Sequence, residues 1–374
     1  MVSQHKNRLV KVSRAADRRE FLQVATATAM LPALTNSVTA EEKPLRVGMV
    51  GRDGHPGLIL DSLPKVPGAI LAAYAKSHPE DNVSTLQKNP AFRKETRIYQ
   101  NYTEMFEKEP LDLVGICLPL FQNAQVAMAA LQKGIHVLQE KPAALTMEEL
   151  DRLEEIFKAG KKRHTLLLNM RAVPVFQAAR RLVREGWIGE PVLISGQKSY
   201  KFGSSRPWYY KERKTYGGTI PWIGIHSIDL MRWISGLEFS EVSATQGNKA
   251  HPAYPGCEDH AAMLFHLKNG GTGFCSLDYL RPDSAPTHGD DRIRMAGSEG
   301  VIEVFENLGK IVLYSKKGTQ EEIPLPPAMD MFSDFIAAIR GEKEQMVPAM
   351  DGFRASRICL KAREAADSGK WVEV

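Results

Sequence analysis

Residues 134–142 read Gly-Ile-His-Val-Leu-Gln-Glu-Lys-Pro, and this stretch limits the possible folds more than any other part of the chain. Residues 135–138 form an apolar run of the length of a buried strand, and the glycine before them is typical of a helix end. Thr146 and Glu149 then predict the capped start of a second helix. Helix, strand and helix in this order predict an open α/β sheet, in which loops after strands hold the ligand. Lys141 lies in such a loop.

The first strand and turn of the chain predict a nucleotide-binding unit. Residues 45–50 predict a strand, residues 58–63 predict a helix, and the turn between them reads Gly-Arg-Asp-Gly-His-Pro-Gly. Such a turn lets the backbone approach a pyrophosphate in front of a helix N-terminus. The Gly-x-Gly-x-x-Gly pattern is altered, because Asp53 stands at its second glycine and Pro56 at its third. A carboxylate there repels pyrophosphate unless it turns away or bonds ribose or backbone.

Two interpretations of this turn stay open. Gly54 and Gly57 can restore access for a phosphate, which His55 can reach; alternatively, the turn keeps its fold and binds nucleotide poorly or not at all. The predicted second strand, residues 69–74, is followed by Lys76 in the region where an acidic residue would bind the ribose hydroxyls. This replacement favours NADP, although nearby acidic residues leave NAD open.

The Glu-Lys-Pro segment around Lys141 resembles the corresponding motif of the glucose–fructose oxidoreductase / inositol dehydrogenase family (Gfo/Idh/MocA). The resemblance runs from about Leu45 to the end of the chain. It implies that Lys141 stands beside the nicotinamide ring and the substrate hydroxyl. The segment Asn-Met-Arg that ends at Arg171 resembles the family's Asn-x-Arg at the cofactor–substrate crevice, although an ion pair between domains explains Arg171 nearly as well.

Two further segments resemble the family but carry replacements. Pro119 follows a predicted strand as in relatives, and Asn123 stands at the position of a family histidine, where it can hydrogen-bond but not titrate. The Gly-Gly segment before His226 resembles the family's Asp-x-x-x-His helix, so His226 matches the family's base and Asp229 lies one turn on. Trp222 replaces the aspartate that would raise the basicity of the histidine. A tryptophan can instead form a wall on which a sugar stacks.

The second half of the chain predicts a large sheet. From residue 242, apolar and polar residues alternate in several segments separated by glycine-rich turns. This pattern predicts a mostly antiparallel sheet with one face free for a partner subunit, hence a homo-oligomer, either dimer or tetramer. Residues 202–216 combine aromatic and cationic side chains, including Trp208, that suit a sugar, although packing or a subunit contact explains them equally well. The four cysteines include no Cys-x-x-Cys pair, and no metal site is predicted.

Residues 1–43 are interpreted as an export signal and linker. The segment Arg-Arg-x-Phe-Leu from residue 18, followed by a short apolar run, resembles a twin-arginine signal. We therefore expect an exported, periplasmic or extracytoplasmic protein without a stable membrane span in its mature form; a disordered tail is the alternative. Residues 1–40 hold six basic and two acidic residues, so most of the net charge of +5 lies there and no nucleic-acid partner is predicted.

These patterns and the resemblance predict an α/β plus α+β protein. A Rossmann-type NAD(P)-binding domain is expected over residues 44–168, and a substrate and oligomerisation domain over residues 169–374. The resemblance implies an NAD(P)-dependent oxidoreductase that transfers hydride at a ring carbon of a sugar, cyclitol or glycoside. One alternative is an NAD-dependent glycosidase or lyase that oxidises its substrate transiently. Another is a non-redox sugar-binding protein on a relic nucleotide fold.

The expected site residues follow from the motifs and from the resemblance. His226 takes the hydroxyl proton as general base, and Lys141 stabilises the developing alkoxide. The residues expected to contact substrate are Arg171, Trp222, Asp229 and Trp208. The residues expected to contact NAD or NADP are Gly51, Arg52, Asp53, His55, Lys76, Pro119, Asn123, Glu140 and Lys141.

Overall fold

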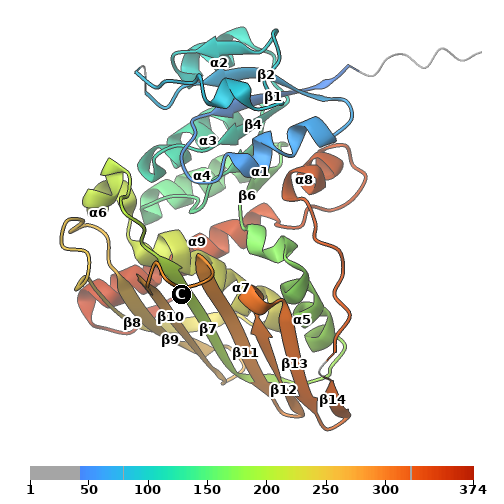
Figure 1. The fold of residues 1–374 in the computed structure, drawn as a ribbon, viewed down its shortest axis with the longest axis vertical. Helices are drawn as coiled ribbons and strands as arrows, with labels where there is room; N and C mark the ends of the chain where they lie inside the picture. The colour runs from blue at the N-terminus through green and yellow to red at the C-terminus, as the bar shows by residue number, and fades with distance from the viewer. Residues whose placement is uncertain (1–42, 79, 321) are drawn as a thin grey trace, which may run out of the picture. The chain divides into compact units, whose positions relative to one another are not determined.

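The computed structural model describes residues 43–374 except residues 79 and 321, so the predicted export signal lies outside the described residues. Six parallel strands form the first sheet in the order β3-β2-β1-β4-β5-β6, which is that of a dinucleotide-binding Rossmann sheet. The strands are β1 (Leu45–Val50), β2 (Ala69–Ala75), β3 (Arg97–Tyr99), β4 (Leu113–Ile116), β5 (His136–Gln139) and β6 (His164–Leu166). The helices between them are α1 (Gly57–Leu60), α2 (Tyr102–Lys108), α3 (Asn123–Gln132) and α4 (Met147–Ala159) (Figure 1).

The helix after the glycine-rich turn is shorter than predicted. α1 ends at Leu60, and a separate 3-10 turn covers Leu63–Lys65, so the prediction of one helix over residues 58–63 was wrong. Pro64 lies in that turn and has no N–H to continue the α-helical hydrogen bonds. The capped start of α4 is confirmed, because the Thr146 hydroxyl accepts a hydrogen bond from the backbone N–H of Glu149 at 3.2 Å.

Within the part of the chain that the structure describes, nine strands form the second sheet, in the order β14-β13-β12-β11-β7-β10-β9-β8-β15. β7 and β10 pair in parallel and all other neighbours are antiparallel, which confirms the predicted mostly antiparallel sheet. The strands are β7 (Pro191–Lys201), β8 (Phe239–Gly247), β9 (His260–Leu267), β10 (Thr272–Arg281), β11 (Gly289–Gly297), β12 (Gly300–Phe305), β13 (Lys310–Ser315), β14 (Gly318–Gln320) and β15 (Val372–Glu373).

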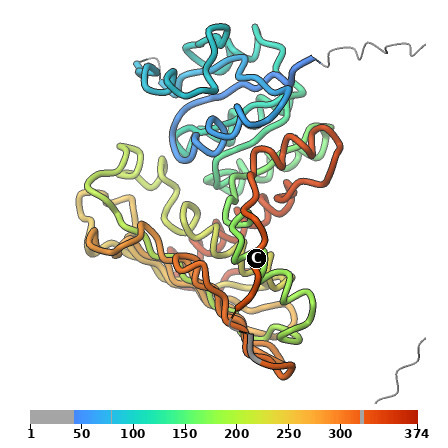
Figure 2. The backbone as a smooth tube through the Cα atoms, turned by 45° about the vertical axis from the view of Figure 1, so that its right-hand side comes forward, coloured from blue at the N-terminus to red at the C-terminus, as the bar shows by residue number. Residues whose placement is uncertain are grey.

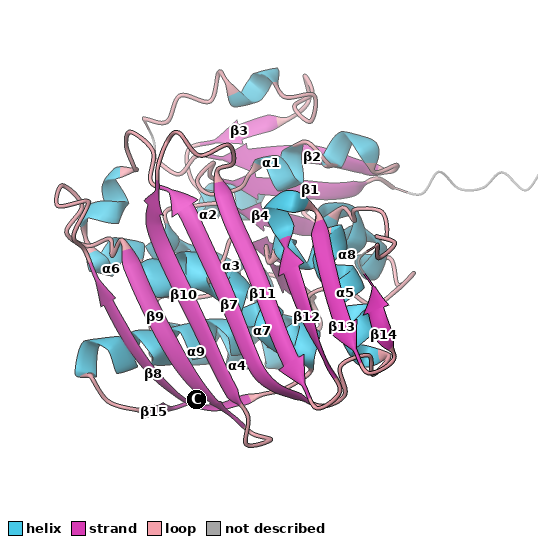
Figure 3. Ribbon diagram, turned by 60° about the horizontal axis from the view of Figure 1, so that its bottom comes forward, coloured by secondary structure: helices cyan, strands magenta, loops and turns pink. Residues whose placement is uncertain are grey.

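Helices cover one face of this second sheet and leave the other face open. The remaining helices are α5 (Pro174–Arg184), α6 (Arg213–Tyr216), α7 (Ile225–Ser235), α8 (Met331–Ile339) and α9 (Ala349–Ser368). α5, α7 and α9 pack on the same face, as the view near the sheet edge in Figure 2 and the view onto the open face in Figure 3 show. The open face carries exposed apolar side chains, among them Leu193, Leu264 and Phe274.

The last helix holds together the two segments that carry the predicted catalytic residues. In α9, the Ser356 hydroxyl accepts a hydrogen bond from Ala143 N at 3.0 Å, and the Arg363 guanidinium donates to the carbonyl oxygens of Leu145 and Gly217 at 2.8 and 2.5 Å. Leu145 follows Lys141 in the chain and Gly217 precedes Trp222. α9 therefore fixes the β5–α4 loop against the segment that leads into α7.

Candidate active site

The turn after β1 has the tight geometry that the sequence predicts for a nucleotide-binding loop. Gly51 has a φ of +77°, and a Cβ atom there would lie 2.3 Å from the carbonyl oxygen of Cys117, so no other residue fits. The backbone N–H of Asp53 donates to that same carbonyl at 2.8 Å. The turn thus lies directly against the end of β4.

Asp53, which replaces the second glycine of the pattern, turns toward the end of β2. Its Oδ2 atom accepts a hydrogen bond from the Ser77 hydroxyl at 3.3 Å, and the Tyr209 hydroxyl contacts the same carboxyl group. Burial raises the pKa of Asp53 above its usual value, against the effect of these hydrogen bonds. The carboxylate therefore lies where a Rossmann fold usually binds ribose.

The other predicted cofactor residues lie in the loops around this turn. Arg52 donates to the carbonyl of Asn82 at 2.8 Å, and Lys76 follows β2 with its backbone N–H bonded to Tyr99 O. Pro119 precedes the turn into α3, where Asn123 Oδ1 accepts from Leu118 N at 3.1 Å. The buried Asn123 Nδ2 has no partner among the residues that the structure describes.

Glu140 joins the glycine-rich turn to the loop that carries Lys141. The Glu140 Oε2 atom accepts from the backbone N–H of His55 at 2.8 Å and lies 2.8 Å from His55 Nδ1. A Cβ atom at Gly54 would lie 2.3 Å from that same oxygen. Burial alone would raise the pKa of Glu140, but the charge and hydrogen bonds of His55 and the charge of Lys141 hold this pKa below its usual value.

The Lys141 amine is buried beneath Trp222. Its side chain is 2% exposed, Nζ donates to the Trp222 carbonyl at 2.9 Å, and Nζ lies 3.1 Å from the centroid of the Trp222 ring. Burial lowers the pKa of Lys141 to about 7, although the Glu140 carboxylate at 3.9 Å acts in the opposite direction. A lysine of this kind exists as both ammonium and free amine near neutral pH.

Trp222 belongs to a π-helical segment, Ile220–Gly224, immediately before α7. From the sequence, the Trp222 indole was expected to stack on a sugar substrate. In the structure, this ring lies over the amine of Lys141. On the glycine-rich turn, the His55 ring stacks with the indole at a centroid distance of 6.0 Å. Isolated π-helical turns occur frequently at functional sites, where they interrupt the regular hydrogen bonds of a helix.

His226 lies in the first turn of α7 and is 5% exposed. Its Nδ1 atom has no partner among the described residues. Burial, then the positive charges of Lys198, Lys141 and His55, lower the pKa of His226 well below its usual value, so its imidazole is neutral at physiological pH. Lys141 and His226 are therefore close enough for the charge of one to act on the other.

A buried ion pair that the motifs do not reveal lies next to His226. Lys198 of β7 is 1% exposed and donates to Asp291 Oδ2 of β11 at 2.7 Å; the Asp291 Oδ1 atom has no partner in the described part of the chain. Lys198 Nζ also lies 4.5 Å from the centroid of the Tyr200 ring. The sequence holds a signal for this residue, since Lys198 falls on the inward side of an alternating strand.

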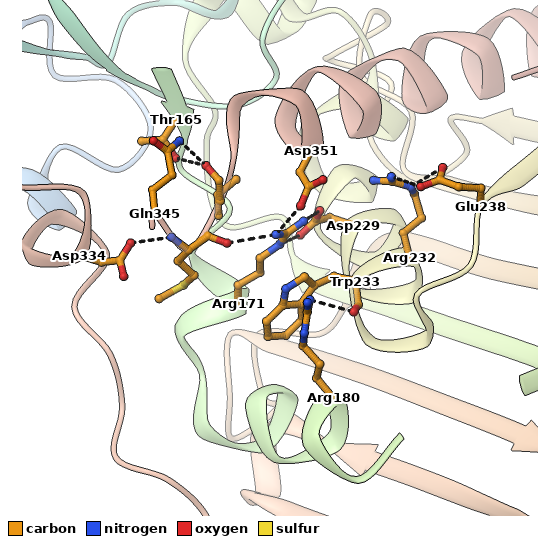
Figure 4. Close-up of polar contacts among 12 residues, drawn as sticks. Thr165, Arg171, Arg180, Asp229, Arg232, Trp233, Glu238, Asp334, Gln345 and Asp351 are labelled. Carbon is orange, nitrogen blue, oxygen red and sulfur yellow. Dashed lines mark hydrogen bonds and ion pairs between the residues drawn. The ribbon is translucent and has the colours of Figure 1, made fainter. Parts of the chain in front are cut away.

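Arg171 and Asp229, both expected at substrate, bind each other (Figure 4). The guanidinium donates from Nε and Nη2 to the two carboxylate oxygens of Asp229 at 2.8 and 2.6 Å, and from Nη1 to Asp351 at 2.8 Å. All of this lies within the helix layer that covers the second sheet, between η4 (Asn169–Ala172), α7 and α9. Both partner carboxylates lie in the predicted second domain, as Arg171 does, so this is an ion pair within that domain and not the pair between domains that the sequence left open.

Trp208, the fourth residue expected at substrate, lies on the surface. It is 62% exposed and its ring meets Phe121, which follows Pro119, edge-on at a centroid distance of 6.1 Å. Its neighbours Tyr209 and Tyr210 are buried. The aromatic segment thus lies against the loops of the first sheet, and Tyr209 covers Asp53 there.

The fold and this site define a two-part oxidoreductase with a Rossmann-type nucleotide-binding half. Comparison with known families agrees: residues 66–167 match the oxidoreductase family with an NAD-binding Rossmann fold, and residues 176–303 match the GFO/IDH/MocA C-terminal domain. The chain belongs to this family of oxidoreductases. The predicted family resemblance is therefore confirmed.

Individual relatives show the same architecture. A solved structure from Thermotoga maritima, provisionally assigned as an oxidoreductase, is 37% identical, with a TM-score of 0.83 over 88% of this chain and 100% of that one. A levoglucosan dehydrogenase solved with NADH and L-sorbose is 21% identical, with a TM-score of 0.76 over 89% and 99% of the two chains. D-apiose dehydrogenase from Paraburkholderia graminis is 22% identical over 74% of this chain and 77% of its own.

The residues present fit NAD on two observations. The Gly51 turn leaves no room for a side chain at the point where the backbone approaches β4. The buried Asn123 Nδ2 and His226 Nδ1 atoms lack partners among the described residues, as expected for polar atoms that would hydrogen-bond to a bound ligand. Arg52, Asp53, Asn123 and Glu140 would then lie around the nucleotide, and Lys141 and His226 around its reactive end.

Proposed function

We propose that the chain is an NAD-dependent oxidoreductase that acts on a ring carbon of a sugar, cyclitol or glycoside. The observation that carries this proposal is the buried Lys141 amine with a pKa lowered to about 7, near the neutral imidazole of His226. Relatives named for D-apiose and levoglucosan support a carbohydrate substrate. The Asp53 carboxylate beside Ser77 supports NAD over NADP, because it would repel a 2′-phosphate.

Bound NAD would supply the acceptor for the hydride, and the side chains would handle the proton of the substrate hydroxyl. The neutral His226, with its Nδ1 atom free of partners in the described chain, accepts that proton. The Lys141 ammonium donates a hydrogen bond to the same oxygen and stabilises its developing negative charge. A pKa near 7 also lets Lys141 exchange a proton at neutral pH.

Trp222 must move from the Lys141 amine before a substrate can reach it. The indole and its carbonyl occupy the contacts of the amine that a substrate hydroxyl would need. We place this opening in the π-helical segment, because its irregular hydrogen bonding allows a local change without unwinding α7.

Mass spectrometry of nucleotide released from the purified protein, together with calorimetric titration of NAD and NADP, tests the proposal. We expect bound or titratable NAD and weaker NADP binding, followed by NADH formation with members of a panel of sugars and cyclitols. Failure to bind either nucleotide would reject the proposed hydride transfer from a sugar, cyclitol or glycoside to NAD. Analysis of the sugar products separates oxidation from net bond cleavage, which is expected of a glycosidase or lyase.

The assignments outside the described site are proposals of their own. Residues 1–43 would act as a twin-arginine signal and linker, residues 44–168 would bind the nucleotide, and residues 169–374 would bind substrate and a second subunit. The exposed Leu193, Leu264 and Phe274 side chains on the open sheet face support the subunit contact. N-terminal sequencing of exported protein tests the signal, and an intact Met1 would reject it. Light scattering tests the subunit contact, and a monomer would reject it.

A further inference from the structure

A surface pocket outside the candidate active site gathers arginine side chains. It has a volume of about 410 Å³ and is lined chiefly by Arg171, Arg180, Arg181, Arg184, Glu185, Trp233 and Met329; these residues define the arginine pocket. Figure 4 shows Arg171 and Arg180 beside Trp233 in this region. Pockets that hold small molecules commonly measure about 300–1,000 Å³. The size therefore suits a small ligand.

The arginines of this pocket differ in whether their charge is balanced. Arg171 is paired with two carboxylates, and Arg181 lies 3.4 Å from Glu185. Arg180 donates to the Trp233 carbonyl at 2.9 Å and has no carboxylate partner in the part of the chain that the structure describes. The exposed Arg184 also has no carboxylate partner within the described residues, 43–374 except 79 and 321. Arg180 and Arg184 thus line the pocket without an ion-pair partner of their own, whereas the lining carboxylate of Glu185 pairs with Arg181.

Arg180 is held in place by Trp233. Its Cζ atom lies 4.3 Å from the centroid of the indole, and the Cζ atom of Arg171 lies 5.3 Å from the same centroid. Burial, then repulsion from Arg184 and Arg171, lowers the pKa of Arg180 to about 10. A cation whose surroundings disfavour its charge gains more from a bound anion than a solvated cation does.

The simpler explanation is that these arginines form the solvated outer face of α5. Positions 180, 181 and 184 do lie on one face of a helix, opposite the buried Ala178, Ala179 and Leu182. That explanation suits Arg181 and Arg184, which are exposed. It does not account for Arg180, which is half-buried against Trp233 and next to a second guanidinium.

We propose that the arginine pocket binds a small organic anion whose carboxylate or phosphate lies between Arg180 and Arg184. The planar guanidinium offers paired N–H donors that match such groups. Trp233 and Met329 add an apolar wall for the ring or carbon skeleton of the ligand. The site is distinct from the candidate active site, because Trp233 and His226 lie near opposite ends of α7.

Calorimetric titration at about 0.05 M salt, where screening is modest, tests the proposal with glucose 6-phosphate, citrate and neutral glucose. We expect saturable one-to-one binding of at least one charged probe. Arg180→Gln should weaken that binding at least about tenfold, or about 1.4 kcal/mol. The matched control Arg181→Gln should weaken it by a clearly smaller factor, because the charge of Arg181 is already offset by its pair with Glu185.

Further variants keep the test decisive. If Arg180→Gln fails to fold, Arg184→Gln takes its place in the test, because position 184 is exposed and its replacement leaves the core intact. Arg184→Gln should weaken the binding of the same probe several-fold. Lys141→Met should leave it unchanged, which separates this site from the active site. Absence of saturable binding of both charged probes would overturn the proposal, and so would equal weakening by Arg180→Gln and Arg181→Gln, which indicates adventitious surface binding.

Discussion

Replacing Lys141 by methionine should make the protein more stable while it removes the proposed activity. Burial lowers the pKa of Lys141 from 10.5 to about 7. One pKa unit corresponds to about 1.4 kcal/mol, so a protonated amine costs the folded state roughly 4–5 kcal/mol relative to the unfolded chain. Methionine fills a similar volume without that charge, but it leaves the buried Trp222 carbonyl without its donor, at about 1–3 kcal/mol. We therefore expect a net stabilisation of about 2 kcal/mol at pH 7.

The lowered pKa of Lys141 also predicts how the stability difference between Lys141→Met and the wild type changes with pH. Between about pH 7 and 10.5, the unfolded chain keeps a proton on Lys141 that the folded protein has lost, so wild-type stability rises with pH in this window. The advantage of Lys141→Met is thus fully present below pH 7 and should shrink toward pH 10. Urea unfolding of both proteins at pH 6, 7, 8, 9 and 10 measures this difference.

Lys198→Met provides a matched control of opposite sign. The Asp291 carboxylate raises the pKa of Lys198 despite its burial, and removal of Lys198 leaves that carboxylate buried and unpaired. A loss of about 3–5 kcal/mol is expected. If Lys141→Met were destabilised as strongly as this control, or if its difference from wild type did not change with pH, the role assigned to burial would be refuted.

Three further predictions concern the cover, the turn and the ion pair. Trp222→Ala should expose the Lys141 amine, so that reductive methylation mapped by peptide mass spectrometry labels Lys141 in the variant and spares it in the wild type; equal labelling would contradict the cover. Gly51→Ala should cost more than about 2 kcal/mol in urea unfolding, whereas Gly203→Ala, with a similar positive φ but open surroundings, should cost about 1 kcal/mol. Arg171→Met should cost about 3–5 kcal/mol, because its partner carboxylate stays buried; a loss below 1 kcal/mol would show that the pair is not structural.

The sequence predicts the parts of this molecule that depend on neighbouring residues. The glycine-rich turn, the Thr146 cap and the alternating strands are local patterns, and the structure contains each of them. The length of α1 was mispredicted although the reason, Pro64, is also local. The helix–strand–helix pattern predicted Lys141 in the loop after a strand, and it lies in the loop after β5.

Contacts between distant segments could not be predicted in this way. The Trp222 ring reaches Lys141 across 81 positions of sequence, and Lys198 meets Asp291 across 93. Asp53 is turned toward Ser77 under a tyrosine from another part of the chain. Periodicity assigns a residue to a face of an element, but it does not say which side chain of another element faces it.

The central claim is that Lys141 and His226 handle the proton of a hydroxyl whose carbon loses a hydride to NAD. The most direct measurement is the rate of NADH formation at saturating NAD, with a carbohydrate that the wild type oxidises, in wild type, Lys141→Met and His226→Asn. We predict rates at least about 100-fold lower in both variants with NAD affinity changed less than about threefold. Rates in either variant within about twofold of the wild type would contradict the account.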